Sequence, residues 1–414
     1  EIEARPGQSG LALVPTGETA FRARVGLANQ AERTLDLQYY IWEVDDSGVL
    51  LAERVMRAAD RGVRVRILLD HVTTRASDLG FSYMDHHPNV EIRLFNPLLT
   101  RKSQIFEFMT DFTRLNHRMH NKAFIADNAA AIVGGRNIGD TYFGVHEDAN
   151  YRDLDLLVVG PVVQDVSFSF DRYWNSDLAV PVDVLIEDRL PAQEAQAKLD
   201  ELYTYVAEIS DYPYPIETSK SELMARLNAL RGDLVWAEAK VLYDEPDRMA
   251  DDEATVFEEL TRSGEEKEHY IAIEAAYVVP DDFIIERAAD NQAKGIRQRL
   301  LTNSMATNDV AAVHAAYSRY RLQLLRNGVE LYELRPDAGK LNENWSALRG
   351  RSRAGLHTKV SVADDRVVAV GSFNLDPRSI NLNTEIVLLV ESAELAAQVR
   401  DYMDGGVLPE NSYR

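Results

Sequence analysis

Residue types suited to phosphate ester chemistry stand at fixed spacing in one stretch of the chain, HNKAFIADNAAAIVGGRN, which begins at His120. His120 and Lys122 are two residues apart, so on an extended strand both side chains leave the same face. The stretch continues with a predicted turn, a glycine pair that lets a ligand approach the backbone, and an amide: Asp127, Gly134-Gly135 and Asn137. An imidazole, an ammonium and an amide together can bind and attack a phosphate group.

The same pattern returns near the C-terminus in HTKVSVADDRVVAVGSFN. Its matching positions are His357, Lys359, Asp364, Gly371, Ser372 and Asn374. A single H-x-K-x4-D is a weak signal, whereas two copies with matching G-[GS]-x-N tails are a strong one. If the halves of the chain pack about a pseudo-twofold axis, both copies can meet in one pocket around one phosphate. One imidazole can then attack phosphorus while the other protonates the departing alkoxide.

The remaining motif residues receive supporting roles. We expect six of them to contact the nonbridging phosphate oxygens, whose charge grows during the attack. They are Lys122, Lys359, Asn137, Asn374, Gly135 and Ser372. Asp127 and Asp364 are expected to build turns without touching the phosphate. This arrangement needs no metal and no cofactor, and no cluster of metal-ligand residues stands beside the motifs in the sequence.

Each imidazole also needs a carboxylate that bonds its far nitrogen. Asp155 and Glu385 are the preferred candidates, because each starts a predicted strand shortly after its motif. Asp153 is the alternative in the first half, and a purely structural role as strand caps is the other reading.

Composition limits the function classes. The 414 residues suffice for two or three domains, and the net charge of −22 argues against a broad nucleic-acid footprint. The absence of cysteine excludes disulfides and thiolate nucleophiles, and no run of eighteen apolar residues predicts a membrane-spanning helix. The chain starts at Glu1 rather than Met, which is consistent with removal of an upstream signal or lipoprotein segment.

The elements that must position the motifs also occur twice. Thr34–Trp42 and Val63–Leu69 are predicted strands around a helix at Ser47–Asp60, a β-α-β unit that implies a parallel sheet. Gly295–Asn303 mirrors Gly62–Asp70, so the α/β unit is duplicated. We expect an N-terminal lobe, a helical connector that includes the start of the second lobe, and a C-terminal lobe: residues 1–180, 181–266 and 267–414.

A segment before the first motif mixes bulky apolar and basic residues, as sequences at a membrane interface do. Its apolar members are Ile105, Phe106, Phe108, Met109 and Phe112, and its basic members are Arg101, Lys102 and Arg114. We expect a lid, with Phe106, Phe108 and Phe112 inserting shallowly into the bilayer. A helix packed into the core is the alternative.

The paired motifs resemble the HKD motifs of the phospholipase D superfamily, and much of both halves resembles bacterial cardiolipin synthases of the C type. The segments that carry the resemblance include LDLQYYIW, RGVRVRILLDH, RMHNKAFIADN, IVGGRNIGDTYFG, DLDLLVVGP and GSFNLDPRS. The resemblance implies an α/β fold with two pseudo-symmetric lobes, each a mostly parallel sheet flanked by helices, and one active site at their interface. It also implies that His120 is the nucleophile and His357 the general acid.

The activity implied is phosphatidyl transfer through a phosphohistidine, with phosphatidylglycerol or phosphatidylethanolamine as substrates. The implied setting is the bacterial cell envelope, with peripheral association to a membrane surface and no nucleic-acid partner. Three other readings remain: a phospholipase D hydrolase that releases phosphatidic acid, a nuclease on the same scaffold, and a membrane-bound scaffold protein with a degenerate site.

Overall fold

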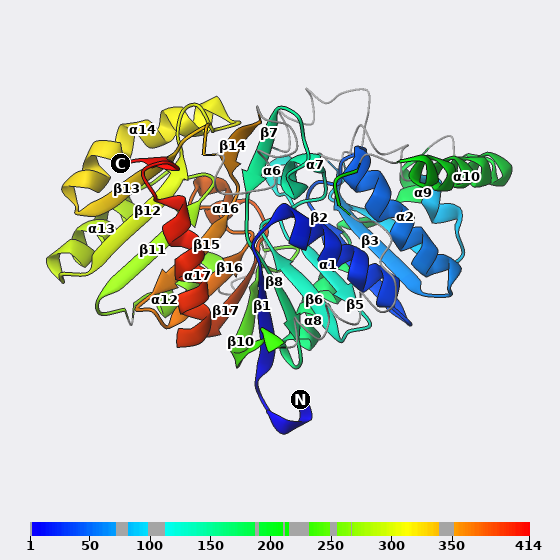
Figure 1. The fold of residues 1–414 in the computed structure, drawn as a ribbon, viewed down its shortest axis with the longest axis horizontal. Coiled ribbons are helices and arrows are strands. Elements are labelled where there is room, and N and C mark those ends of the chain that lie inside the picture. Colours follow the sequence, from blue (N-terminus) through cyan, green and yellow to red (C-terminus); the bar gives the residue numbers. More distant parts are fainter. Residues whose placement is uncertain are drawn as a thin grey trace.

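The computed structural model describes residues 2–71, 82–97, 112–186, 190–209, 212–214, 232–248, 255–265, 267–338 and 352–414. Within these residues the molecule has two lobes, and the strands of both lobes join edge to edge in one continuous sheet (Figure 1). The two-lobed α/β fold predicted from the sequence is therefore confirmed.

The large sheet contains sixteen of the described strands. From the edge of the second lobe to that of the first they are β18 (Ser412–Tyr413), β13 (Val329–Leu334), β12 (Arg297–Asn303), β11 (Tyr270–Ala275), β15 (Lys359–Ala363), β16 (Val367–Gly371), β17 (Ile386–Glu391), β10 (Val235–Tyr243), β1 (Ser9–Val14), β8 (Asp155–Val159), β6 (Ala130–Gly134), β5 (Ala123–Ala126), β2 (Thr34–Tyr39), β3 (Arg64–Asp70), β4 (Val90–Phe95) and β9 (Ala179–Pro181). A separate parallel pair, β7 (Ala149–Arg152) and β14 (Arg353–Leu356), links the lobes.

The sheet is mixed, whereas the sequence analysis predicted a mostly parallel sheet. The strands of the β-α-β units, β2-β3-β4 and β11-β12-β13, are parallel as predicted. The motif strands are antiparallel, as in the pairs β5–β6 and β15–β16. The reason is local, because each motif contains a tight turn and a tight turn can join only antiparallel strands.

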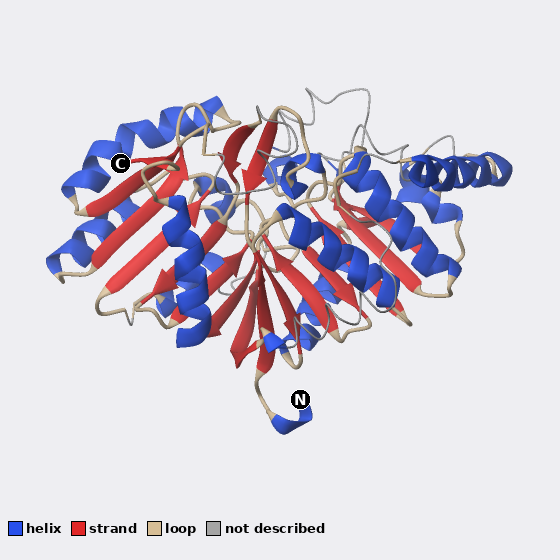
Figure 2. Cartoon of the chain, viewed as in Figure 1, coloured by secondary structure: helices blue, strands red, loops and turns tan. Residues whose placement is uncertain are grey.

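Helices cover both faces of the sheet (Figure 2). The described helices of the chain are η1 (Ile2–Ala4), α1 (Gly17–Gln30), α2 (Asp46–Asp60), η2 (Met84–His86), α6 (Phe112–Asn116), α7 (Asp140–Phe143), α8 (Val162–Trp174), α9 (Val182–Leu185), α10 (Ala192–Glu208), α12 (Val256–Ser263), α13 (Asp282–Ala293), α14 (Ala311–Arg326), α16 (Pro377–Asn381) and α17 (Ala393–Gly406). The side chains of α1 and α2 pack on one face of the first lobe, and those of α8 pack on the other.

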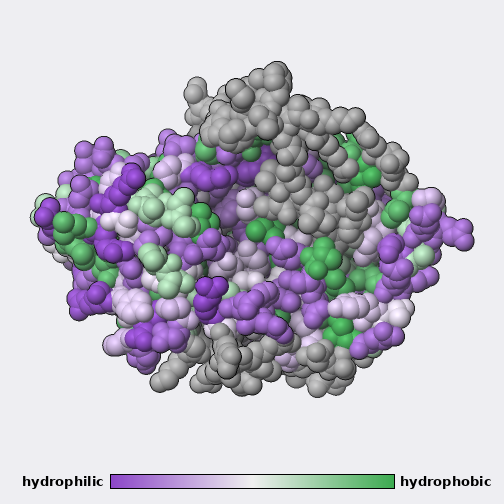
Figure 3. Space-filling view, turned by 90° about the horizontal axis from the view of Figure 1, so that it is seen from above, coloured by the Kyte–Doolittle hydropathy of each residue, from purple (hydrophilic) through white to green (hydrophobic). Residues whose placement is uncertain are grey.

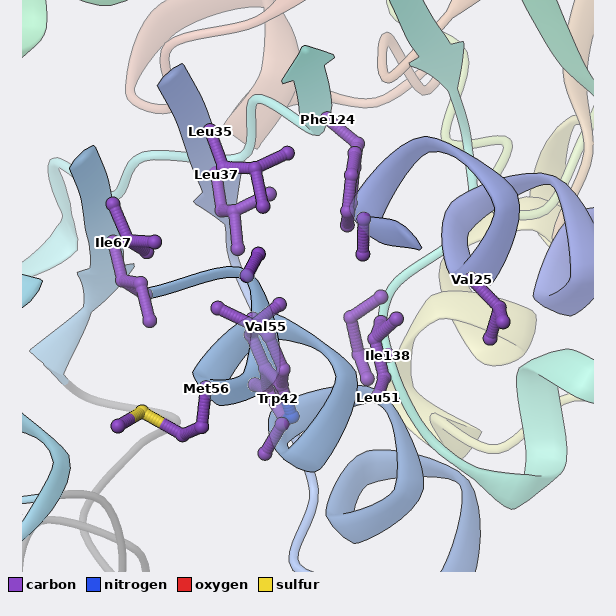
Figure 4. Close-up of a cluster of buried hydrophobic side chains, with 14 of the residues drawn as sticks. Val25, Leu35, Leu37, Trp42, Leu51, Val55, Met56, Ile67, Phe124 and Ile138 are labelled. Carbon is purple, nitrogen blue, oxygen red and sulfur yellow. The ribbon is translucent and has the colours of Figure 1, made fainter. Parts of the chain in front are cut away.

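The core of the first lobe is densely filled on the face under α1 and α2. Leu35 and Leu37 of β2 and Phe124 of β5 are fully buried there against Leu51 and Val55 of α2 (Figure 4). Burial of each such side chain favours folding by about 1.5–3 kcal/mol. This face therefore fixes the position of β5, which follows directly after the first motif lysine.

The predicted connector is divided between the lobes. Its helix α10 packs against α2 of the first lobe. Its strand β10 lies in the centre of the sheet, where it pairs with β1 on one side and β17 on the other. The segment therefore contributes a strand to the junction that joins the two motifs.

No described helix is long and apolar enough to cross a membrane. Seen from above, the coloured surface is mostly hydrophilic, with hydrophobic residues in separate spots (Figure 3). The predicted lid residues from Arg101 to Met109, including Phe106 and Phe108, lie outside the described residues. Phe112 is the first residue of α6.

Candidate active site

Both motif histidines lie in short segments at the junction of the lobes, and each is held by the backbone of the opposite lobe. The His120 N–H donates to the carbonyl of Thr384 (2.9 Å), and the His357 N–H donates to the carbonyl of Arg152 (2.8 Å). His357 follows β14, which pairs with β7 in the upper centre of Figure 1. The strand pairing between lobes thus brings the two motifs together.

Each imidazole is also bonded by a carboxylate from the opposite lobe. Nδ1 of His120 lies 2.8 Å from Oε2 of Glu385, and Nδ1 of His357 lies 2.6 Å from Oδ2 of Asp153. Both carboxylates are fully buried. Because each Nδ1 is bonded to a carboxylate, Nε2 is the ring nitrogen that could react with a substrate.

Asp155, the carboxylate that the sequence analysis preferred in the first half, does not bond an imidazole. Its carboxylate pairs with Arg24 (3.0 Å) and Arg136 (3.3 Å), and it bonds neither imidazole. Asp155 is the first residue of β8 and pairs with Gly134 in the sheet, whereas Asp153 lies two residues before the strand, where it meets the other lobe. The prediction of Asp155 as an orienting carboxylate is therefore corrected to Asp153.

The repeat contains the signal that identifies Asp153. Gly134 pairs with Asp155 in the first lobe, and Gly371 pairs with Val387 in the second. Two residues before each of these partners stand Asp153 and Glu385. Alignment of DLDLLVV with EIVLLVE would have matched these two carboxylates, and would have placed Asp155 on a valine.

The two motif lysines lie beside the histidines. Nζ of Lys122 donates to the carbonyl of His120, and Nζ of Lys359 donates to that of His357. Nζ of Lys359 also lies 3.3 Å from Nδ1 of His357. Burial is the main cause that lowers the pKa of both ammonium groups. An anionic ligand between them would favour their charged forms.

The motif amides are fixed by backbone N–H groups. Oδ1 of Asn137 accepts from Ile41 N (3.2 Å), and Oδ1 of Asn374 accepts from Tyr277 N (3.4 Å). Nδ2 of Asn137 is buried and lies beside the Tyr142 hydroxyl, without a hydrogen bond of ordinary geometry among the described residues. A buried donor without a partner is costly, so this amide is a suitable site for a phosphate oxygen.

Gly135 and Ser372, expected to bind phosphate, lie against the carboxylates. A Cβ at position 135 would lie 2.2 Å from Oδ1 of Asp153, so only glycine leaves room for this carboxylate. Oγ of Ser372 donates to Oε2 of Glu385 (2.5 Å), and Oγ of Ser379 donates to Oε1 (2.7 Å). These contacts fix the groups that orient the imidazoles.

Asp127 and Asp364 hold the turns of the two motifs. Asp127 has a positive φ of 55° and accepts from three consecutive backbone N–H groups, those of residues 32 to 34. Asp364 has a φ of 49° and accepts from residues 268 to 270 in the same way. Each aspartate thus anchors the start of the strand next to its motif strand, β2 or β11.

The surroundings of the two imidazoles shift their pKa values to different extents. Burial lowers the pKa of His120 well below its usual range, and it also lowers the pKa of His357, where the Asp153 charge acts in the opposite direction. Burial raises the pKa of Glu385 to about 7. Burial acts to raise the pKa of Asp153 too, but the His357 imidazole and the adjacent ammonium outweigh it and lower that pKa. Asp153 is therefore the more strongly ionised partner.

Three tyrosines near the imidazoles were not identified from the sequence. The Tyr40 ring lies 5.1 Å from that of His120, and the rings of Tyr142 and Tyr151 lie 5.1 and 5.4 Å from that of His357. None belongs to the repeated motif, so motif spacing carried no signal for them. They restrict the positions of the two imidazole rings.

Comparison with known proteins places this geometry in context. Residues 25–174 and 260–405 match the family model described as "Cardiolipin synthase, PLD-like domain". Cardiolipin synthase C of Escherichia coli K12 is 40% identical over 397 residues, which cover 94% of this chain and 83% of that protein. Cardiolipin synthase A of Pseudomonas entomophila is 26% identical and covers 94% and 67%. The crystal structure of phosphatidylserine synthase from Haemophilus influenzae is similar in fold, with a TM-score of 0.66, 14% identity and coverage of 97% and 87%.

Proposed function

Because the chain belongs to the cardiolipin synthase family with phospholipase D-like domains, we propose that it transfers phosphatidyl groups between alcohols. The donor is phosphatidylglycerol or phosphatidylethanolamine, the acceptor is phosphatidylglycerol, and the product is cardiolipin. One observation carries the proposal. Two histidine–lysine pairs, each with a carboxylate from the opposite lobe, meet in one buried site.

In the first half-reaction, Nε2 of His120 attacks the phosphorus of the donor and forms a P–N bond. The P–O bond to the headgroup breaks, and protonated His357 gives its Nε2 proton to the departing alkoxide. Lys122, Lys359 and Asn137 stabilise the charge that grows on the nonbridging oxygens. The products are a phosphatidyl-histidine and the free headgroup alcohol.

In the second half-reaction, neutral His357 takes the proton of the incoming alcohol, whose oxygen attacks phosphorus. The P–N bond breaks and His120 is restored. If the alcohol is phosphatidylglycerol, the product is cardiolipin, and if water takes its place, the product is phosphatidic acid. Access of the acceptor therefore decides between transfer and hydrolysis.

The unequal electrostatics support this division of roles. A nucleophilic imidazole must be neutral, and the strongly lowered pKa of His120 favours that form. A general acid must carry a proton, and ionised Asp153 beside His357 counters the burial that lowers the pKa of this imidazole. The geometry of the two motifs is otherwise similar, so this charge difference is the argument for the assignment.

The site is proposed to act at a membrane surface in the bacterial cell envelope, with the protein bound peripherally. Phe106, Phe108 and Phe112 are proposed to contact the bilayer, as their mixture with basic residues suggests. This part of the proposal is independent of the chemistry at the histidines.

The test is incubation with vesicles of radiolabelled phosphatidylglycerol, in parallel with labelled single-stranded DNA, with and without a chelator. We expect labelled cardiolipin from the lipid, no cleavage of the DNA and no effect of the chelator. Phosphatidic acid as the main product would identify a hydrolase, and DNA cleavage without lipid turnover would overturn the proposal.

A further inference from the structure

The second lobe contains an apolar cavity that the mechanism does not use. Its volume is about 230 Å³, and it lies between α12, α13 and one face of the sheet. Phe257 and Leu260 of α12 and Ile284 of α13 form its outer wall, and Ile271 and Ile273 of β11 lie on the sheet side. In Figure 1, α13 lies at the far left of the molecule, and α12 lies below it and nearer the centre.

The duplicated first lobe shows why the cavity exists. Leu37 of β2 pairs with Phe124, and at the same register in the second lobe Ile273 of β11 pairs with Ser361. Phe124 is fully buried in the filled core of the first lobe (Figure 4). Ser361 therefore takes the place of a buried phenylalanine, and it lines the cavity.

At two further positions the second lobe also has a smaller side chain than the first lobe. Phe124 pairs with Ile132 on β6, whereas Ser361 pairs with Ala369 on β16. Alignment of the glycines that end the helices, Gly62 and Gly295, also places Ala288 of α13 at the position of Val55 of α2. The covering helix is shorter too, because α12 has 8 residues and α1 has 14. At these positions the first lobe has large side chains that fill its core, and the second lobe has small side chains that leave the cavity.

The cavity reaches β15, the strand that begins with the second motif lysine. Lys359, whose Nζ bonds the His357 carbonyl, belongs to the cavity lining together with its strand neighbours Ala275 and Ser361. The lining also contains the basic residues Lys267 and Arg287. An occupant is therefore apolar along most of its length and close to the phosphate-binding lysine at one end.

We propose that this cavity binds one acyl chain of the donor phospholipid while its phosphate lies between the motif lysines. The inference rests on the proposed function. The mostly apolar lining suits an alkyl chain, and the proposed phospholipid substrate has alkyl chains joined to a phosphate. A wholly polar occupant is disfavoured, since along the apolar part of the lining it would lose hydration without gaining partners. The chain would gain from removal of its methylene groups from water.

The binding test uses variants that restore the side chains of the first lobe. Ala369→Ile and Ser361→Phe should fill the cavity, while Ala315→Ile adds the same bulk at an exposed position of α14 in the same lobe. With cis-parinaric acid as the fluorescent chain probe, we expect the Kd to rise about tenfold in the filled variants. The Kd should stay at the wild-type value in Ala315→Ile and in His120→Ala. An unchanged Kd in both folded cavity variants would overturn the proposal.

The kinetic test links the cavity to the substrate chain. The ratio of turnover of dioctanoyl-phosphatidylglycerol to that of chain-free bis(p-nitrophenyl) phosphate should fall about tenfold or more in Ala369→Ile. An unchanged ratio would show that the cavity does not hold the donor chain. Failure of the wild-type protein to use either substrate would instead refute the proposed function, and the probe titration would still decide whether the cavity binds a chain.

Discussion

At the scale of single residues, the site depends on which carboxylate meets which imidazole. Asp153 and Asp155 are two residues apart on one strand, yet the first bonds His357 and the second bonds buried arginines. The two aspartates therefore form a matched pair, in which the same chemical change should have different consequences.

Asp153→Asn should lower kcat by roughly 10²–10⁴-fold, because a neutral amide cannot stabilise the protonated form of His357. Asp155→Asn should retain more activity but lose stability, on the order of 3–5 kcal/mol, because Arg24 and Arg136 lose a buried counter-charge. Steady-state kinetics and urea unfolding measure the two effects. A larger kcat loss in Asp155→Asn would contradict the corrected assignment.

Glu385 should make stability depend on pH. Its pKa is raised from 4.5 to about 7 in the folded protein, so the folded state keeps a proton that the unfolded state has lost. The free energy of unfolding contributed by this group therefore falls as the pH rises from 4.5 through 7. Glu385→Gln removes this contribution, so its Tm relative to wild type should rise over that pH range. Parallel Tm curves for both proteins would contradict the raised pKa.

At the scale of elements, the end of β10 fixes the segment that carries Glu385. Asp244 accepts from the Glu385 N–H (2.9 Å) and pairs with Arg248 (3.1 Å). The Arg248 guanidinium donates to the carbonyls of Ile380 and Asn383. The connector thus positions the partner of His120 without entering the site.

Arg248→Met should lower kcat by roughly 10–100-fold with little change in KM, because a small displacement of Glu385 misplaces the nucleophile. Arg172→Met is the control, since Arg172 is half exposed and pairs with the neighbouring Glu245. Its kinetics should match those of the wild type. Equal kinetics in both variants would show that Arg248 does not position the site.

Sequence patterns predicted some elements better than others. The β-α-β units follow from apolar periodicity and from glycines at the helix ends, and Gly62 and Gly295 adopt positive φ angles there. The antiparallel direction of the motif strands was not predicted, because the parallel β-α-β units were expected to continue across each lobe, whereas a tight turn joins the two strands of each motif. Motif spacing predicted the histidines, lysines and amides, whereas the contact of Asp153 with His357 depends on how the lobes pack.

At the scale of the whole molecule, two lobes share one sheet and complete each other's site. The backbone and the side chain of each histidine are bonded to the opposite lobe. The motif spacing predicted one pocket at a pseudo-twofold axis, but no spacing within one half could predict the exchange of carboxylates. Each half therefore lacks a complete imidazole–carboxylate pair.

Because a single chain supplies both histidines, inactive variants should not complement each other. An equimolar mixture of His120→Ala and His357→Ala should be as inactive in the lipid assay as either variant alone. Recovery of activity on mixing would contradict a site built within one chain, because it would require exchange of lobes between molecules.

The central claim is that His120 forms the covalent intermediate and His357 moves the proton. The most direct measurement is intact-protein and peptide mass spectrometry after rapid quenching of the His357→Ala variant with dioctanoyl-phosphatidylglycerol. We predict one added phosphatidyl group on the peptide that contains His120, and none in His120→Ala. An adduct on His357 in the His120→Ala variant, with none on His120 in His357→Ala, would contradict this account.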